Sequence, residues 1–417
     1  MNDPEAERYN ALPYPPRDPA DEKKRLISGS PSHILEIDHC IYGGRRDWTQ
    51  PFRALVAGGG TGDATVMLAQ QLADAKCPAE IVHLDLSQAS SDIARARVAM
   101  RGLKNVQFVT GAIEELAALK LGRFDYIDCC GVLHHLAEPD RGLRILADQL
   151  ADDGGIGLMV YAPVGRTGVY HLQPMLRLIA GSDPWPDRVA TAKKLLAQLP
   201  ATNWFKKNTA LGDHLLGDAG IADLLLPARD RPYAIVDFVR LIGAAGLRLA
   251  SLVTALRYEP ALYLRDPDLL ARLAKTQPLE RAAFAELLAG NMRTHLAYAV
   301  KAANKTQTVA IADAPAAVPV LREPHDPTIA AARGAPAGKT IALAAQFDGY
   351  TARIALPGLA PAILTRIDGH ASIGAIFAAC EGAASPAPDW PTFKREFDRL
   401  FVILNGLNKL FLRRPRA

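Results

Sequence analysis

The glycine-rich turn at residues 58–62 constrains this chain more than any other feature of its sequence. An apolar run at residues 52–57 leads into the turn, and an amphipathic helix is expected over residues 64–72. Glycine accepts backbone angles that other residues avoid and lets a ligand approach bare backbone amides. A strand, a tight glycine turn and a helix N-terminus together predict a site for a nucleotide-like ligand.

An acidic residue at the end of the next expected strand sharpens this prediction. A second apolar run at residues 81–84 ends in Asp85 and Leu86, roughly twenty residues after the glycine turn, as in nucleotide-binding α/β folds. A carboxylate there can accept hydrogen bonds from both hydroxyls of a ribose. Asp85 could instead cap the following helix, but the glycine turn upstream favours ribose binding. The two features predict an adenosine-containing cofactor.

The spacing of the glycines distinguishes between cofactors. Gly58, Gly60 and Gly62 alternate, whereas a dinucleotide fingerprint reads G-x-G-x-x-G. The alternating pattern resembles motif I of the class I S-adenosylmethionine-dependent methyltransferases. That resemblance implies a loop that cradles the aminoacyl part of the cofactor. A nicotinamide-dependent oxidoreductase is the alternative that this spacing disfavours.

Further segments follow in the order and at the spacing of that family. Residues 106–110 indicate a third strand, and residues 111–116 follow where the family lines the adenine. Residues 124–130 indicate a fourth strand that runs into the GVLHHL segment at 131–136, and residues 154–161 supply a fifth. The series implies an α/β, Rossmann-like, doubly wound fold with a mostly parallel, seven-stranded sheet.

The resemblance also assigns the residues of the site. His135 and Tyr161 are the candidate catalytic residues. For His134 and His135 a general-base role competes with packing or acceptor positioning. For Tyr161, contact with the acceptor competes with a loop-stabilising pair with Arg166. No third ligand follows the two histidines at a metal-site spacing, so no metal is expected. The residues assigned to the cofactor are Gly58, Gly60, Gly62, Asp85, Leu86, Ala112, Ile113, Cys129 and Gly131.

Two positions depart from the family pattern. Val56 stands where the family usually has an acid, two residues before the first glycine. The cofactor's amino group must therefore find another acceptor, such as a backbone carbonyl. Ala112 stands where an acid or amide often follows the third strand, so backbone groups are expected to bind the adenine.

The chain is long enough for more than one domain. Residues 1–50 contain a Y-x-x-x-P-Y-P segment at 9–15. In methyltransferases with a similar opening this segment folds over the cofactor as a lid, and a surface arm fits equally well.

The methyltransferase domain is expected over residues 51–305. It carries a helical insertion at about 166–222, at the edge of the sheet where ligands bind. The insertion is expected to select the acceptor or to form a dimer face.

The C-terminal part of the chain has a different composition. Residues 306–340 are rich in alanine and proline and are expected to form a linker. Residues 341–417 are expected to form a small, mainly helical domain. Its pattern resembles winged-helix or PqqD-like modules, which bind peptides or pack against a catalytic partner.

Composition excludes several classes of protein. A net charge of +4 on 417 residues predicts no nucleic-acid footprint. No apolar run approaches the roughly twenty residues of a membrane helix. Five cysteines without metal-site spacing fit the reducing cytoplasm.

These features lead to one functional prediction and, besides the oxidoreductase, one further alternative. The prediction is methyl transfer from S-adenosylmethionine to a small molecule or a protein side chain, by a protein that could be a homodimer. The N-P-P-Y/F signature of enzymes that methylate DNA bases is absent after Asp128, so a flipped base is not expected. The alternative is a non-catalytic, cofactor-sensing module that engages another protein.

Overall fold

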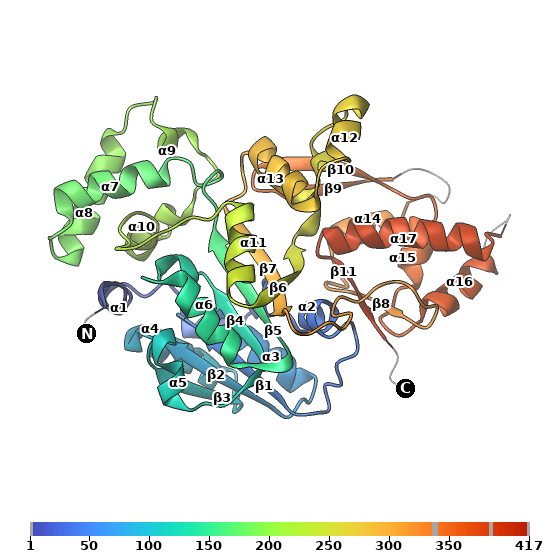
Figure 1. The fold of residues 1–417 in the computed structure, drawn as a ribbon, viewed down its shortest axis with the longest axis horizontal. Helices are drawn as coiled ribbons and strands as arrows, with labels where there is room; N and C mark the ends of the chain where they lie inside the picture. The colour runs from blue at the N-terminus through green and yellow to red at the C-terminus, as the bar shows by residue number, and fades with distance from the viewer. Residues whose placement is uncertain (1–2, 336–340, 383–386, 415–417) are drawn as a thin grey trace. The chain divides into compact units, whose positions relative to one another are not determined.

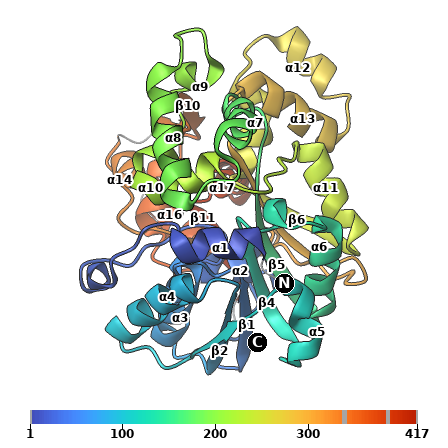
Figure 2. The same ribbon diagram turned by 90° about the vertical axis from the view of Figure 1, so that its left-hand side faces the viewer.

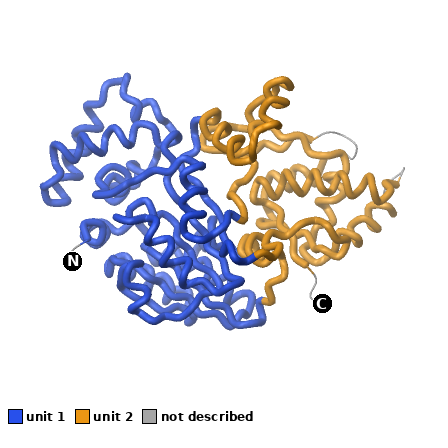
Figure 3. The backbone as a smooth tube through the Cα atoms, in the orientation of Figure 1, with its two compact units in different colours: residues 1–34, 48–249, 290–304 blue, residues 35–47, 250–289, 305–417 orange. Residues whose placement is uncertain are grey.

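The computed structural model describes residues 3–335, 341–382 and 387–414. The last residues of the expected linker, 336–340, lie outside the described part. The chain divides into two compact units, which Figure 3 distinguishes by colour. We call them the sheet unit (residues 1–34, 48–249 and 290–304) and the second unit (residues 35–47, 250–289 and 305–417).

A seven-stranded sheet organises the sheet unit (Figure 1), and it confirms the expected Rossmann-like fold. The strand order is β3-β2-β1-β4-β5-β7-β6. Strands β1 to β5 pair in parallel, and β7 is antiparallel to β5. The strands are β1 (Phe52–Ala57), β2 (Ala79–Asp85), β3 (Val106–Thr110), β4 (Phe124–Cys130), β5 (Leu150–Tyr161), β6 (Leu247–Val253) and β7 (Thr294–Lys301).

Helices cover both faces of this sheet. Figure 2 shows α3 and α4 on one side of the parallel strands and α5 and α6 on the other. Strand β1 is therefore buried on both faces and consists almost entirely of apolar residues, as parallel strands do. The helices along this region are α1 (Pro4–Ala11), η1 (Pro19–Lys23), α3 (Asp63–Asp74), α4 (Gln88–Met100), η2 (Ile113–Glu115), α5 (Leu116–Leu119), η3 (Leu133–His135), α6 (Pro139–Asp148) and α11 (Ile235–Ala244).

The segment after β5 forms a helical insertion with a small core of its own. Leu172, Val189 and Leu224 are among its buried residues. Its packed residues run from Val169 to Leu225, slightly past the expected boundary at residue 222. The helices are α7 (Val169–Ala180), α8 (Trp185–Gln198), α9 (Trp204–Lys207), η4 (Asp213–Leu215) and α10 (Gly217–Leu225).

The second unit is built from three separate stretches of the chain. Its strands form two antiparallel pairs, β9 with β10 and β8 with β11. The β9–β10 hairpin was not anticipated from the sequence. The elements are α2 (Ile34–Ile41), η5 (Ala255–Tyr258), η6 (Pro260–Leu262), α12 (Pro267–Leu273), α13 (Pro278–Ala289), β8 (Val318–Leu321), α14 (Pro327–Arg333), β9 (Ile341–Phe347), β10 (Tyr350–Leu356), α15 (Ala360–Arg366), α16 (Ile373–Glu381), α17 (Trp390–Gly406) and β11 (Leu410–Arg413).

The stretch expected to be a linker differs from that expectation. Residues 306–335 contain β8 and α14, and Ile329 and Ala332 are buried in the core of the second unit. Asp326 caps α14 by accepting hydrogen bonds from two backbone amides. Alanine is both a strong helix former and small enough to bury, so an alanine-rich stretch can pack as well as link.

Within the described residues, no helix is both long and apolar enough to cross a membrane.

We expect Ile329→Ala to destabilise the protein by about 2–5 kcal/mol, because it removes buried methyl groups from the core. Val402→Ala, on an exposed face of α17 (64% exposed), is the control and should change stability by less than about 0.5 kcal/mol. Urea unfolding of the full chain measures both. A negligible effect of Ile329→Ala would mean that the 306–335 stretch acts as a linker after all.

Candidate functional site

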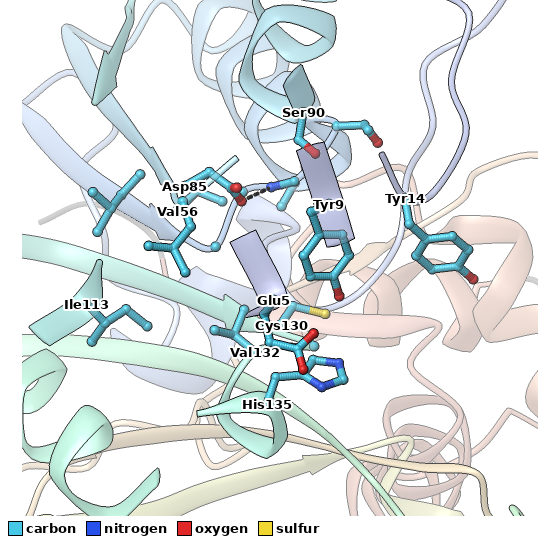
Figure 4. Close-up of a pocket in the computed structure, with 18 of the residues that line it drawn as sticks. Glu5, Tyr9, Tyr14, Val56, Asp85, Ser90, Ile113, Cys130, Val132 and His135 are labelled. Carbon is cyan, nitrogen blue, oxygen red and sulfur yellow. Dashed lines mark hydrogen bonds between the residues drawn. The ribbon is translucent and has the colours of Figure 1, made fainter. Parts of the chain in front are cut away.

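A cavity of about 370 Å³ opens at the carboxyl edge of the parallel strands. Its walls come from the sheet unit. They include the ends of β1, β2, β4 and β5 with the segments that follow them, the segment after β3, the N-terminal segment and Asp223 of α10. Of the residues assigned to the site from the sequence, those that line it are Gly58, Gly60, Gly62, Asp85, Leu86, Ile113, Gly131, His135 and Tyr161. Figure 4 shows several of these side chains around the cavity.

The glycine turn needs glycine for two physical reasons. Gly58 and Gly62 have φ angles of +74° and +97°, which other residues rarely adopt. A Cβ atom at Gly58 would lie 2.4 Å from a Val132 methyl group, and one at Gly62 would lie 2.7 Å from the Ala94 Cβ. Without side chains, the backbone of the turn forms one wall of the cavity.

Asp85 is held in place by the turn itself. Its Oδ2 accepts a hydrogen bond of 2.7 Å from the Gly60 amide (Figure 4). Its Oδ1 accepts one of 2.7 Å from the Ser87 amide. Burial raises the pKa of Asp85, and these hydrogen bonds oppose that rise. Each carboxylate oxygen keeps a lone pair that can accept a further hydroxyl hydrogen bond.

Two assigned residues do not line the cavity. Cys129 is fully buried, and its neighbour Cys130 lines the cavity instead. Successive residues of a strand point to opposite faces, so only one of the two can face a ligand. Ala112 does not line the cavity, whereas the next two residues, Ile113 and Glu114, do. The Ala112 amide donates a hydrogen bond of 2.9 Å to the Glu115 carboxylate.

His135 lines the cavity and has one ring nitrogen without a partner among the described residues. Its Nδ1 lies 2.6 Å from the carbonyl oxygen of Arg229. Because a carbonyl only accepts, Nδ1 carries the proton and Nε2 keeps its lone pair. The Nε2 atom is buried and has no hydrogen-bond partner among the described residues. The guanidinium of Arg229 in turn donates to the His135 carbonyl at 2.9 Å, so the imidazole has one orientation.

The neighbouring histidine is part of the packing. His134 does not line the cavity, and burial lowers its pKa well below the usual value. Its ring packs against that of Tyr161, tilted by 34°, with 4.0 Å between the centroids. The structure thus separates the pair, with His135 facing the cavity and His134 supporting Tyr161.

Tyr161 faces the cavity as a hydrogen-bond donor. Its hydroxyl donates to Asp223 at 3.2 Å, and the Arg166 guanidinium lies 3.6 Å from its ring centroid. Burial raises the pKa of Tyr161 well above its usual value. The phenol therefore stays protonated near neutral pH and cannot act as the base.

The N-terminal segment contributes to the cavity wall and is held by a buried ionic cluster. Arg8 pairs with Glu5 at 2.8 Å and with Asp223 at 3.2 Å, and both acids are buried. The Tyr9 hydroxyl donates to Asp223 at 3.0 Å. Arg229 extends the cluster through an ion pair of 2.8 Å with Asp3.

A second set of contacts holds the following residues. The Thr61 hydroxyl donates to the Pro15 carbonyl at 2.8 Å, next to the glycine turn. Arg97 binds both Glu22 and Asp63, at 2.6 and 2.7 Å. Sequence reasoning missed Glu5, Asp223 and these partners, because residues separated by 34 to 215 positions carry no shared local signal.

Comparisons with known proteins agree with this geometry. Residues 55–156 match the Methyltransferase domain family. An uncharacterized protein of Synechococcus sp., syc1184_c, is 30% identical over 288 residues, which is 67% of each chain. The ubiquinone biosynthesis O-methyltransferase of Azoarcus sp. is 30% identical over 152 residues, 36% of this chain and 59% of that relative.

One solved structure shares the fold over most of the chain. The structure of PKMT2 from Rickettsia typhi, in complex with AdoHcy, covers 92% of this chain and 75% of its own. The TM-score is 0.64 at 13% identity.

We expect Arg8→Met to loosen the N-terminal segment, because it leaves the buried carboxylates of Glu5 and Asp223 without their cation. Amide hydrogens of residues 3–14 should exchange roughly ten to a hundred times faster, as measured by mass spectrometry. The control is Lys24→Met, which removes an exposed ion pair with Asp21 and should leave the exchange unchanged. Equal exchange in the two variants would show that the cluster does not hold the segment.

Proposed function

Because this chain belongs to the S-adenosylmethionine-dependent methyltransferases, we propose that it methylates a hydroxyl group of a small molecule. His135 removes the proton from that hydroxyl. The observation that carries this proposal is the buried, unpartnered Nε2 of His135 at the cavity wall. A neutral hydroxyl is a weak nucleophile and needs a base at the moment of transfer.

The residues around the cavity suit this cofactor. We assign Asp85 to the ribose hydroxyls, and the backbone of Gly58, Gly60 and Gly131 to the aminoacyl part. Ile113 and Leu86 offer apolar contacts for the adenine. When bound, S-adenosylmethionine supplies a methyl group that is already electrophilic, so the chain has to orient the acceptor and hold its proton.

The identity of the relatives supports an oxygen acceptor. The Azoarcus relative and a second relative from Bordetella avium are both ubiquinone biosynthesis O-methyltransferases. Each match covers only 36% of this chain. Because these matches cover so little of the chain, the proposal of a hydroxyl acceptor rests mainly on the orientation of His135, and the relatives agree with it. A protein side chain is the competing acceptor.

Two other parts of the sheet unit receive roles in this proposal. The N-terminal segment acts as the lid of the cofactor site, because Tyr9, Tyr14 and Pro15 line the cavity. The helical insertion selects the acceptor, because α10 carries Asp223, which binds the Tyr161 hydroxyl at the cavity wall. Tyr161 positions the acceptor beside His135.

The class of acceptor can be tested with isotopically labelled cofactor. We incubate the protein with labelled S-adenosylmethionine and either a small-molecule extract or the proteins of the same cells. We expect label in the small-molecule fraction, in a product that resists alkali as an ether does, detected by mass spectrometry. Label confined to the protein fraction would replace a small-molecule acceptor with a protein one.

We expect His135→Asn to lower the rate of labelling by roughly a hundredfold to ten-thousandfold, the usual contribution of a general base. Asparagine can still donate to the Arg229 carbonyl, so the local structure is kept. Calorimetry with S-adenosylhomocysteine should show nearly unchanged affinity. An active His135→Asn variant would remove the base from the proposal.

Asp85→Ala should weaken S-adenosylhomocysteine binding by about 1–3 kcal/mol, because the ribose hydroxyls lose their acceptor and two backbone amides lose theirs. The matched control is Asp74→Ala, at the end of α3; among the described residues its carboxylate accepts one exposed hydrogen bond, from Gln70. Calorimetry measures both variants. Unchanged affinity of Asp85→Ala would mean that the ribose lies elsewhere.

A further inference from the structure

The end of β1 leaves one charge of the cofactor without a partner. The methionine part of S-adenosylmethionine carries a cationic ammonium group. At Val56, where the family usually has an acid, the side chain is apolar, 1% exposed and part of the cavity wall. A cation enclosed in a cavity needs a compensating negative charge or several acceptors.

The neighbouring strand places a carboxylate beside this position. β4 pairs in parallel with β1, and Asp128 is the register partner of Val56. Paired residues of adjacent parallel strands project from the same face of the sheet, with the strands roughly 4.8 Å apart. Asp128 also lines the cavity. Its carboxylate therefore stands one strand away from the place of the missing acid.

The surroundings of Asp128 hold it in a defined orientation. The Ser32 hydroxyl donates to its Oδ2, and the Cys130 amide donates to the carboxylate as well. Ser32 is itself held by the hydroxyls of Tyr126, at 3.0 Å, and Tyr298, at 3.1 Å. Three elements thus cooperate to orient one carboxylate.

Asp128 also lacks a cation. Its side chain is 2% exposed, and no arginine or lysine of the described residues pairs with it. Burial raises its pKa to about 6. A buried carboxylate without a counter-charge is costly for a folded protein. The hydrogen bonds from Ser32 and Cys130 leave lone pairs free for another donor.

We infer that Asp128 binds the ammonium group of S-adenosylmethionine and takes the place of the acid that Val56 lacks. The inference rests on the proposed function, because it takes this cofactor as the ligand of the cavity. It replaces the expectation that a backbone carbonyl alone binds the ammonium group.

The experiment compares two ligands by calorimetry. One is S-adenosylhomocysteine, and the other is its analogue with hydrogen in place of the α-amino group. The wild type should bind S-adenosylhomocysteine roughly ten to a hundred times more tightly, the scale of a hydrogen bond between charged groups. Equal affinities overturn the inference, whereas failure to bind either ligand overturns the proposed function instead.

Variants then identify the residue that binds the ammonium group. Asp128→Asn should lose most of the preference between the two ligands and bind the analogue as the wild type does. Adding Val56→Asp to that variant should restore the preference, because the carboxylate returns on the adjacent strand. Asp125→Asn, on the same strand but outside the cavity wall, is the control and should keep the preference.

The folding of the variants is checked without ligand. Asp128→Asn removes an unpaired buried charge, so at pH 8 it should unfold at or above the wild-type temperature. If that variant does not fold, Asp128→Ser replaces it in the same comparison. A folded variant that keeps the full preference for S-adenosylhomocysteine shows that Asp128 has only a structural role.

Discussion

The parallel pairing of β1 with β2 on one side and with β4 on the other determines where the groups of the site lie. Parallel strands end at one edge, so the residues that follow them meet there. The register pairs Ala57 with Leu84, which brings Asp85 to the glycine turn, and pairs Val56 with Asp128. The hydrogen bond from Gly60 to Asp85 then joins two strand ends directly. A shift of register by one residue would turn Asp128 away from the cavity.

Asp223 connects three parts of the sheet unit that are distant in sequence. Its carboxylate receives Arg8 and Tyr9 from the N-terminal segment and Tyr161 from the end of β5, while its own helix belongs to the insertion. Such a buried cluster stabilises the protein only when all its members are present. The N-terminal segment and the insertion are therefore joined through one carboxylate, which also binds the Tyr161 hydroxyl.

The second unit shows why composition alone is a weak guide to packing. An alanine- and proline-rich stretch has the composition of a linker, yet Ala317, Ile329 and Ala332 are buried in a core. The difference lies in the partners: α14, which carries Ile329 and Ala332, packs against α15 and β9. Proline at the first turn of α14 is compatible with a helix, because that position needs no backbone donor.

Neighbouring residues of the chain are enough to predict the strands, the turn and part of the chemistry of the site. Apolar runs predict the strands, and the glycines predict the turn. Ribose binding by Asp85 is predicted because this residue ends the strand that follows the glycine turn. The sequence leaves open which of His134 and His135 lines the cavity, and the structure shows that His135 does; it shows likewise that Cys130 lines the cavity and Cys129 does not. The ion pair of Arg8 with Asp223 and the pairing of Asp128 with Val56 also become visible in the structure alone. Local order is encoded in short-range patterns, whereas the orientation of a side chain and its distant partners follow from packing.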